Sequence, residues 1–222
     1  MADSNRWDPT PAASYARPIL DLETAFGRAR VHLHPVKRPR AVLVLGHGAG
    51  GGIAAPDLVA ATRGAHAVGL SVALVEQPYR VAGRRSPAPA RQLDAAWSQT
   101  LGQLRERTFG ELPIVAGGRS SGARVACRTA AEVGAVAVLC LAFPLHPPGR
   151  ADDPAKSRLP ELEALALPTL VVQGDRDPFG IPPEGPNRTV VRVPGDHALR
   201  DGDSVSAAVA DWLPIGLIAG VG

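Results

Sequence analysis

The chain reads Ile114-Val115-Ala116-Gly117-Gly118-Arg119-Ser120-Ser121-Gly122 at its middle, and the alanine-rich residues 123–130 follow. The apolar start predicts a strand over 114–116, and the small residues after the turn predict a helix. Gly118, Ser120 and Gly122 fit the pattern Gly-x-Ser-x-Gly, which puts a serine on a strained turn between a strand and a helix. Glycines on either side remove side chains that would collide where strand and helix nearly touch. This setting favours Ser120 as a nucleophile over a serine that only caps a βα turn.

Outward from this turn, apolar runs alternate with helical patterns along almost the whole chain. Further strands are predicted at 41–45, 71–75, 135–141, 169–173 and 189–193, with an early edge strand at 30–34. Apolar residues at helical spacing predict helices over 58–68, 93–104, 159–165 and 205–213, the first of them ended by Gly69. The alternation predicts a single α/β domain over 1–222, with a mostly parallel, doubly wound sheet and an irregular lead-in over 1–18.

Composition narrows the class of protein. The chain has 222 residues, of which 45% are hydrophobic, so it can bury a core and is not a disordered protein. Its formal net charge is +3, and no basic stripe is interleaved with aromatic residues, so we expect no nucleic-acid partner. Cys127 and Cys140 lie in apolar runs, where buried free thiols are ordinary, and they make no disulfide framework.

The two ends of the chain bear on its location. Residues 1–18 hold polar residues and prolines but not the apolar segment of a secretory signal. Residues 212–222 are apolar but too few to span a bilayer. We therefore expect a cytoplasmic protein with no membrane partner, while the sequence indicates no oligomeric state.

An acid and a base follow the last two predicted strands. Asp177 comes after the strand at 169–173 and His197 after the strand at 189–193. A serine hydroxyl needs an imidazole to take its proton, and a carboxylate must fix the tautomer of that imidazole. The order serine, aspartate, histidine is the one expected of an α/β-hydrolase, and all three residues follow carboxyl ends of strands. Asp175 is an alternative acid, and each residue alone could be an ordinary loop residue.

A glycine-rich loop, residues 46–52, follows the strand at 41–45. Acyl transfer needs preorganised donors for an oxyanion, and in this fold one is the N–H after the nucleophile, here Ser121. The second donor is expected in the loop, first at Ala49 and next at Gly50. The alternative, a phosphate-binding loop, lacks the expected Gly-Lys-Ser/Thr and Gly-x-Gly-x-x-Gly patterns. We expect His47 to brace the loop by hydrogen bonding and not to act as the base.

The combined motifs resemble a known family. They are His47-Gly48-Ala49-Gly50-Gly51, Glu76-Gln77-Pro78-Tyr79-Arg80, Gly117-Gly118-Arg119-Ser120-Ser121-Gly122, Phe143-Pro144-Leu145-His146-Pro147-Pro148-Gly149 and Gln173-Gly174-Asp175-Arg176-Asp177-Pro178-Phe179-Gly180. Together they resemble the small, lid-less α/β-hydrolases related to dienelactone hydrolase. The greatest similarity is to a bacterial subgroup akin to the hydrolase-like domain of the animal NSL histone-acetyltransferase complex subunit. It spans about residues 41–213 and implies an α/β-hydrolase fold without a full lid, an uncovered site and an intact triad.

The resemblance also bears on which reaction is expected. Dienelactone hydrolases proper resemble a version of this family in which the nucleophile is a cysteine. The serine at this position therefore argues against the dienelactone hydrolase reaction itself. The segment 144–168, where many relatives insert a lid, is short and holds one small predicted helix. We expect no metal and no organic cofactor.

Several further residues are candidates for substrate binding. Arg119, beside the nucleophile, is interpreted first as an ion-pair partner and second as an anchor for an anionic substrate group. Gly50, Tyr79 and Arg80 are further candidates. Arg80 shares a loop with Arg84 and Arg85, which predicts either a solvated surface or a preference for anionic substrates.

These observations predict a serine hydrolase with Ser120, His197 and Asp177 as its catalytic residues. The expected substrate is a small-molecule carboxylic ester or thioester, cleaved through an acyl-enzyme. Two alternatives stay open. One is a catalytically silent hydrolase fold that binds proteins, and the other is acyl transfer or cyclisation in a biosynthetic pathway, since the same machinery serves several reactions.

Overall fold

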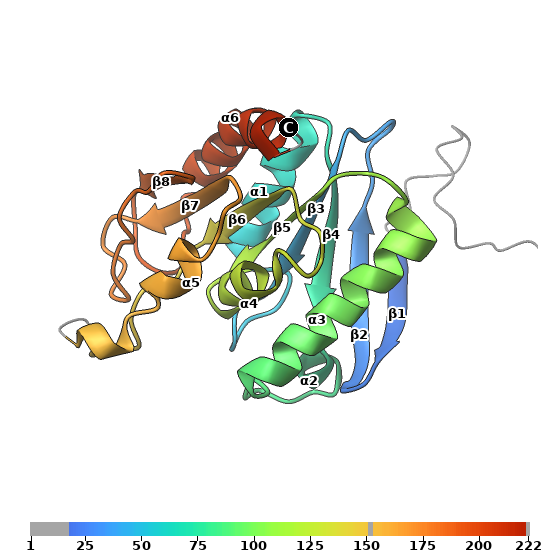
Figure 1. Ribbon diagram of the computed structural model, residues 1–222, viewed down its shortest axis with the longest axis horizontal. Helices are drawn as coiled ribbons and strands as arrows, with labels where there is room; N and C mark the ends of the chain where they lie inside the picture. The colour runs from blue at the N-terminus through green and yellow to red at the C-terminus, as the bar shows by residue number, and fades with distance from the viewer. Residues whose placement is uncertain (1–17, 151–152, 221–222) are drawn as a thin grey trace, which may run out of the picture.

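The computed structural model describes residues 18–150 and 153–220, which form one eight-stranded sheet with helices on both faces (Figure 1). The strands are β1 Ile19–Thr24, β2 Gly27–His34, β3 Val42–Gly46, β4 Ser71–Glu76, β5 Ile114–Arg119, β6 Ala137–Leu141, β7 Thr169–Gly174 and β8 Arg188–Val193. Their order across the sheet is β1-β2-β4-β3-β5-β6-β7-β8. β2 pairs antiparallel with both β1 and β4, and the other neighbours pair in parallel. The predicted mostly parallel sheet is confirmed.

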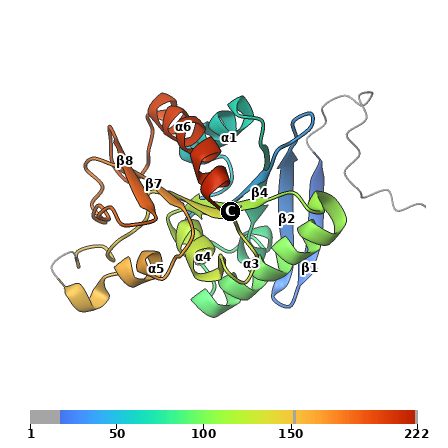
Figure 2. The same cartoon turned by 45° about the horizontal axis from the view of Figure 1, so that its top comes forward.

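The helices form two layers (Figure 2). They are α1 Pro56–Ala67, α2 Pro78–Val81, α3 Ala90–Leu104, α4 Ser121–Thr129, α5 Leu159–Glu163 and α6 Gly202–Gly220. α1 and α6 pack together on one face, while α3, α4 and α5 cover the other. A π-helical turn at Arg105–Phe109 extends α3, and a single 3-10 turn at Pro154–Lys156 precedes α5.

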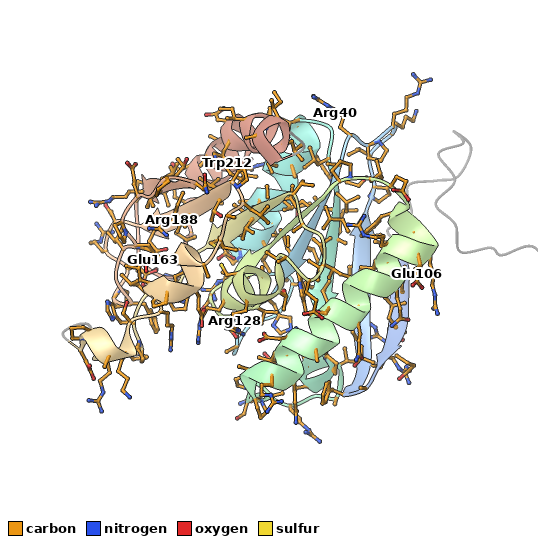
Figure 3. The ribbon with its side chains drawn as sticks, in the orientation of Figure 1. Arg40, Glu106, Arg128, Glu163, Arg188 and Trp212 are labelled. Atoms are coloured by element: carbon orange, nitrogen blue, oxygen red, sulfur yellow. The ribbon has the colours of Figure 1, made fainter. Side chains whose placement is uncertain are left out.

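Alternate residues of the central strands point to opposite layers, because successive side chains in a strand face opposite ways. Val42 and Val44 of β3 pack with α3 and α4, whereas Leu43 and Leu45 pack with α1 and α6. Trp212, labelled on α6 in Figure 3, joins this second cluster. Both faces of β3 are therefore buried, which explains its unbroken apolar sequence.

Three details differ from the sequence expectations. The predicted edge strand at 30–34 is the inner strand of a hairpin, because β1 pairs along its outer side. α2 falls in a stretch expected to be a loop, and α6 continues through Pro214 to Gly220. The predicted lead-in lies outside the described residues except for Pro18.

The segment between β6 and β7 holds only the short 3-10 turn and α5 among its described residues, so no full lid is present there. Cys127 and Cys140 are buried free thiols, as expected, with their sulfurs 3.5 Å apart. Within residues 18–150 and 153–220, no helix has the length and apolar character needed to cross a membrane.

Candidate active site

Ser120 lies on the sharp turn between β5 and α4. Its backbone has φ 52° and ψ −111°, a left-handed conformation that is strained for a residue with a side chain. The turn brings α4 against β3, since a Cβ added at Gly122 would lie 2.4 Å from the carbonyl oxygen of Gly46. A Cβ at Gly118 would lie 2.7 Å from the same oxygen. The two flanking glycines are therefore required by backbone contacts, as the sequence pattern predicts.

This close approach predicts a large stability loss for Gly122→Ala. The new methyl would meet backbone atoms of Gly46 and His47, which cannot move aside as a flexible side chain can. We expect the free energy of unfolding, measured with urea, to fall by about 3 kcal/mol or more. The matched control is Gly102→Ala in α3, where an added Cβ meets nothing within 4 Å. That variant should gain about 0.5–1 kcal/mol, and an equally tolerated Gly122→Ala would contradict the prediction.

The three predicted catalytic residues lie in one hydrogen-bonded row. His197 Nε2 is 2.9 Å from Ser120 Oγ, and His197 Nδ1 is 2.8 Å from Asp177 Oδ2. The Asp177 side chain is fully buried, while 17% of the His197 side chain is exposed. The imidazole can therefore donate from Nδ1 to the carboxylate and accept the serine proton at Nε2.

Asp177 is held from two further directions. The Gln173 Nε2 group donates to Asp177 Oδ2 at 2.7 Å, and the backbone N–H of Phe179 donates to Oδ1 at 2.9 Å. The Phe179 ring packs on the His197 ring with centroids 4.2 Å apart. Asp175, the alternative acid, is exposed and accepts the backbone N–H of Gly195 instead. The sequence analysis gave Gln173 no role of its own, although its place near the end of β7, four residues before Asp177, is a usable signal.

His47 holds the loop after β3 by hydrogen bonding, as predicted. His47 Nδ1 donates to the carbonyl of Gly48 at 2.8 Å, and Nε2 accepts the backbone N–H of Gln77 at 3.1 Å. Burial lowers the pKa of His47, which fits a neutral imidazole that both donates and accepts. The Tyr79 hydroxyl donates to the Ala49 carbonyl at 2.8 Å, so a buried tyrosine also holds this loop.

The two residues predicted as oxyanion donors have backbone N–H groups without intramolecular acceptors. Within the described part of the chain, the backbone N–H groups of Ala49 and Ser121 donate to no carbonyl or side chain. Ser121 is the first residue of α4, where a helix leaves its N–H groups without partners. Gly50 is exposed, and nothing lies within 4 Å of a Cβ added there.

Arg119 forms an ion pair with Asp57, and its Nε lies 2.8 Å from Asp57 Oδ2. Its Nη2 donates to the backbone carbonyl of His197 at 3.0 Å. The Asp57 side chain is fully buried in the first turn of α1, and 18% of the Arg119 side chain is exposed. Burial raises the pKa of Asp57 to about 6, while the Arg119 charge opposes that rise. The first interpretation of Arg119, as an ion-pair partner, is confirmed, but Asp57 carries no sequence motif that would have identified it.

Most of the chain matches a known protein family. A family model described as "Alpha/beta hydrolase domain" matches residues 39–203, which is most of the chain. The chain belongs to the α/β-hydrolase family. No curated protein matches this hydrolase.

Solved structures share the fold of the hydrolase at low identity. An α/β serine hydrolase without a lid, from Xanthomonas campestris, is 19% identical, with a TM-score of 0.68 over 92% of this chain and 99% of that chain. An esterase domain from Rhodothermus marinus is 15% identical, with a TM-score of 0.65 over 90% and 98%. A dienelactone hydrolase from Anabaena variabilis is 16% identical, with a TM-score of 0.65 over 90% and 97%. At these identities the likeness shows the fold.

The arginine loop of the hydrolase borders two open grooves. One of about 440 Å³ is lined by Phe26, Tyr79 and Arg84 among others, and one of about 520 Å³ by Tyr79, Arg84 and Arg85 among others. Arg84 and Arg85 are exposed, and neither forms an ion pair with any described residue. Arg80 is half-exposed and donates to the Arg84 carbonyl at 3.3 Å. Contacts of Gly50, Tyr79 and Arg80 with substrate stay predictions.

Across 18–150 and 153–220, no three His, Cys, Asp or Glu side chains gather in a way that could hold an ion.

Proposed function

We propose that this α/β-hydrolase cleaves a carboxylic ester or thioester of a small molecule through an acyl-enzyme on Ser120. The observation that carries the proposal is the row from Ser120 Oγ through His197 to Asp177, with contacts of 2.9 and 2.8 Å. A serine hydroxyl becomes a nucleophile only with such a base and orienting acid.

The reaction has two halves. Ser120 Oγ attacks the acyl carbonyl while His197 Nε2 takes its proton, and the N–H groups of Ala49 and Ser121 bind the developing oxyanion. The tetrahedral intermediate expels the alcohol or thiol, which receives the proton from His197. Water then gives a proton to His197 and attacks the acyl-serine. The second intermediate releases the acid, and the proton returns to Ser120.

The hydrogen-bonded row of Ser120, His197 and Asp177 also argues against a catalytically silent binding module, because binding a protein does not require a serine, a histidine and an aspartate in this arrangement. Acyl transfer to another acceptor would use the same residues. Hydrolysis is favoured because 17% of the His197 side chain is exposed and the described part of the segment between β6 and β7 holds no full lid, so that water can reach the site. We further propose that the chain belongs to the bacterial subgroup akin to the NSL-complex hydrolase-like domain. The expectations of a cytoplasmic location and of no nucleic-acid or membrane partner stay predictions.

The proposal is tested by labelling the protein with a fluorophosphonate probe and mapping the adduct by peptide mass spectrometry. We expect a single modified serine, Ser120, because among the hydroxyls that the structure describes only this one lies at hydrogen-bond distance, 2.9 Å, from an imidazole nitrogen. Prior heat unfolding should abolish labelling, which controls for non-specific reaction. No labelling of the folded protein, or an adduct on Ser121, would overturn the assignment.

An open site also predicts the dependence on acyl-chain length. A deep pocket would gain about 0.8 kcal/mol per buried methylene, so kcat/KM would rise several-fold per two-carbon step. Without a full lid among the described residues, we expect a flat or falling profile across p-nitrophenyl esters from acetate to decanoate. A steady rise to decanoate would show a deep acyl pocket and contradict this prediction.

A further inference from the structure

The guanidinium of Arg119 touches three parts of the site at once. It pairs with Asp57 on α1 through Nε at 2.8 Å and donates through Nη2 to the His197 carbonyl at 3.0 Å. Its Nη1 would lie 2.8 Å from a Cβ added at Gly48, so it also packs directly against the loop after β3. Among the hydrogen bonds and ion pairs of residues 18–150 and 153–220, no other side chain joins the backbone at His197 to α1.

The position of Arg119 in the chain makes these contacts a geometric constraint. It is the last residue of β5 and the neighbour of Ser120, whose own N–H donates to the Leu141 carbonyl at 2.9 Å. Its backbone is therefore fixed with Ser120, while its side chain holds the backbone of His197. One residue thus spans the two partners of the 2.9 Å contact between Oγ and Nε2.

Asp57 fixes the guanidinium in turn. The Asp57 carboxylate accepts the backbone N–H of Leu58 through Oδ1 at 2.9 Å, and its Oδ2 faces Arg119. Because the Asp57 carboxylate is itself held by a hydrogen bond, it limits the rotamers that the long Arg119 side chain can adopt.

A contribution to fold stability does not by itself explain the ion pair between Arg119 and Asp57. The Asp57 side chain is fully buried, and a buried ion pair often contributes no more than apolar residues of similar size. Removing one member is costly because it leaves an unpaired buried charge, but removing both together is often neutral or stabilising. Fold stability and active-site geometry can therefore be separated by experiment.

We propose that Arg119 and Asp57 form a positioning pair that holds His197 at hydrogen-bond distance from Ser120. The inference rests on the proposed function, since positioning matters only if His197 activates Ser120. Neither residue touches the reacting atoms, and both act through the His197 loop. A misplacement of about 1 Å in such a base lowers turnover about 100-fold.

The decisive variants are Arg119→Met, Asp57→Leu and the double variant, compared with wild type. Either single change should lower the melting temperature, and the double variant should recover most of that loss. In the double variant we still expect kcat for p-nitrophenyl acetate to be about 10–100-fold below wild type, with KM changed less than about threefold. Recovery of kcat together with the melting temperature would overturn the proposal. If the double variant does not fold, Arg119→Gln at low temperature is judged by the same kcat threshold.

A control of the same kind lies away from the site. Arg128, labelled in Figure 3, pairs with Asp94 at 2.6 Å and with Glu161 at 3.3 Å, joining α4 to α3 and α5. Arg128→Met also removes a partly buried arginine from its carboxylates. It should lower the melting temperature but leave kcat within about threefold of wild type at 25 °C. An equal loss of kcat in Arg128→Met would overturn the positioning role.

A measurement independent of turnover separates this inference from the proposed function. The Nδ1–H proton of His197, bound to Asp177, should give a strongly downfield proton resonance in wild type that shifts or broadens in the double variant. If wild type does not react with a fluorophosphonate, the proposed function fails, and this resonance alone decides the positioning role. An unchanged resonance in the double variant would overturn that role.

Discussion

Ser120→Ala is expected to lower kcat/KM for p-nitrophenyl acetate by about 10⁵–10⁶-fold, because among the described residues no other hydroxyl forms a hydrogen bond with His197. The remaining rate would come from the oxyanion donors acting on a bound ester. The fold should be unaffected, since the substitution removes only Oγ, whose hydrogen bond is to the partly exposed His197. The backbone N–H of residue 120 keeps its bond to the Leu141 carbonyl. Circular dichroism melting should therefore give a melting temperature close to that of wild type.

Ser121→Ala is the matched control for this experiment. Ser121 contributes its backbone N–H to the proposed oxyanion site, and alanine retains that group. The Ser121 hydroxyl forms no hydrogen bond with any described residue, so we expect activity within about threefold of wild type. If Ser121→Ala loses activity as Ser120→Ala does, or if Ser120→Ala stays active, the nucleophile has been assigned wrongly.

The central part of this fold follows from local sequence. β3 is an unbroken apolar run, and β5 begins with the apolar residues 114–116 and leads into a serine flanked by glycines at the required spacing. Such signals are local because burial on both faces and close backbone contacts dictate the residue types directly. The same holds for Asp177 and His197, which follow strands and so meet at one edge of the sheet.

The edges of the fold are less predictable. β1 was not predicted because it lies on the margin of the sheet, where exposed and half-exposed residues leave no continuous apolar run. α2 is only four residues long, too short for helical periodicity to show. α6 continues past Pro214 because a helix packed along the sheet can tolerate a proline that an isolated helix would not.

The partners of the site residues are harder still to predict. Asp57 meets Arg119 across 62 positions of sequence, and Tyr79 meets Ala49 across 30. Contacts of this kind arise from the order of strands in the sheet, not from any local pattern. The sequence can name the residues that do chemistry, since chemistry restricts their type, whereas the residues that hold them in place become visible only with the fold.

The choice between Asp177 and Asp175 gives the second large prediction. Three donors face the Asp177 carboxylate: His197 Nδ1, Gln173 Nε2 and the Phe179 N–H. An asparagine would offer one acceptor oxygen and one NH₂ group, so at least one donor would face an NH₂ group. If the NH₂ group takes the place of Oδ2, it faces His197 Nδ1 and favours the wrong tautomer of the imidazole. If it takes the place of Oδ1, it faces the Phe179 N–H and displaces the loop that carries residue 177. In both cases the imidazolium formed during catalysis loses its negative partner.

We therefore expect Asp177→Asn to lower kcat by about 10³-fold or more, measured with p-nitrophenyl acetate at constant pH. Asp175→Asn is the matched control, because Asp175 accepts only the Gly195 N–H, which an asparagine oxygen can also accept. It should change kcat by less than about threefold. A larger loss in Asp175→Asn than in Asp177→Asn would assign the acid to Asp175. Equal small losses would mean that His197 needs no carboxylate, since its tautomer would then be held by the packing of the Phe179 ring alone.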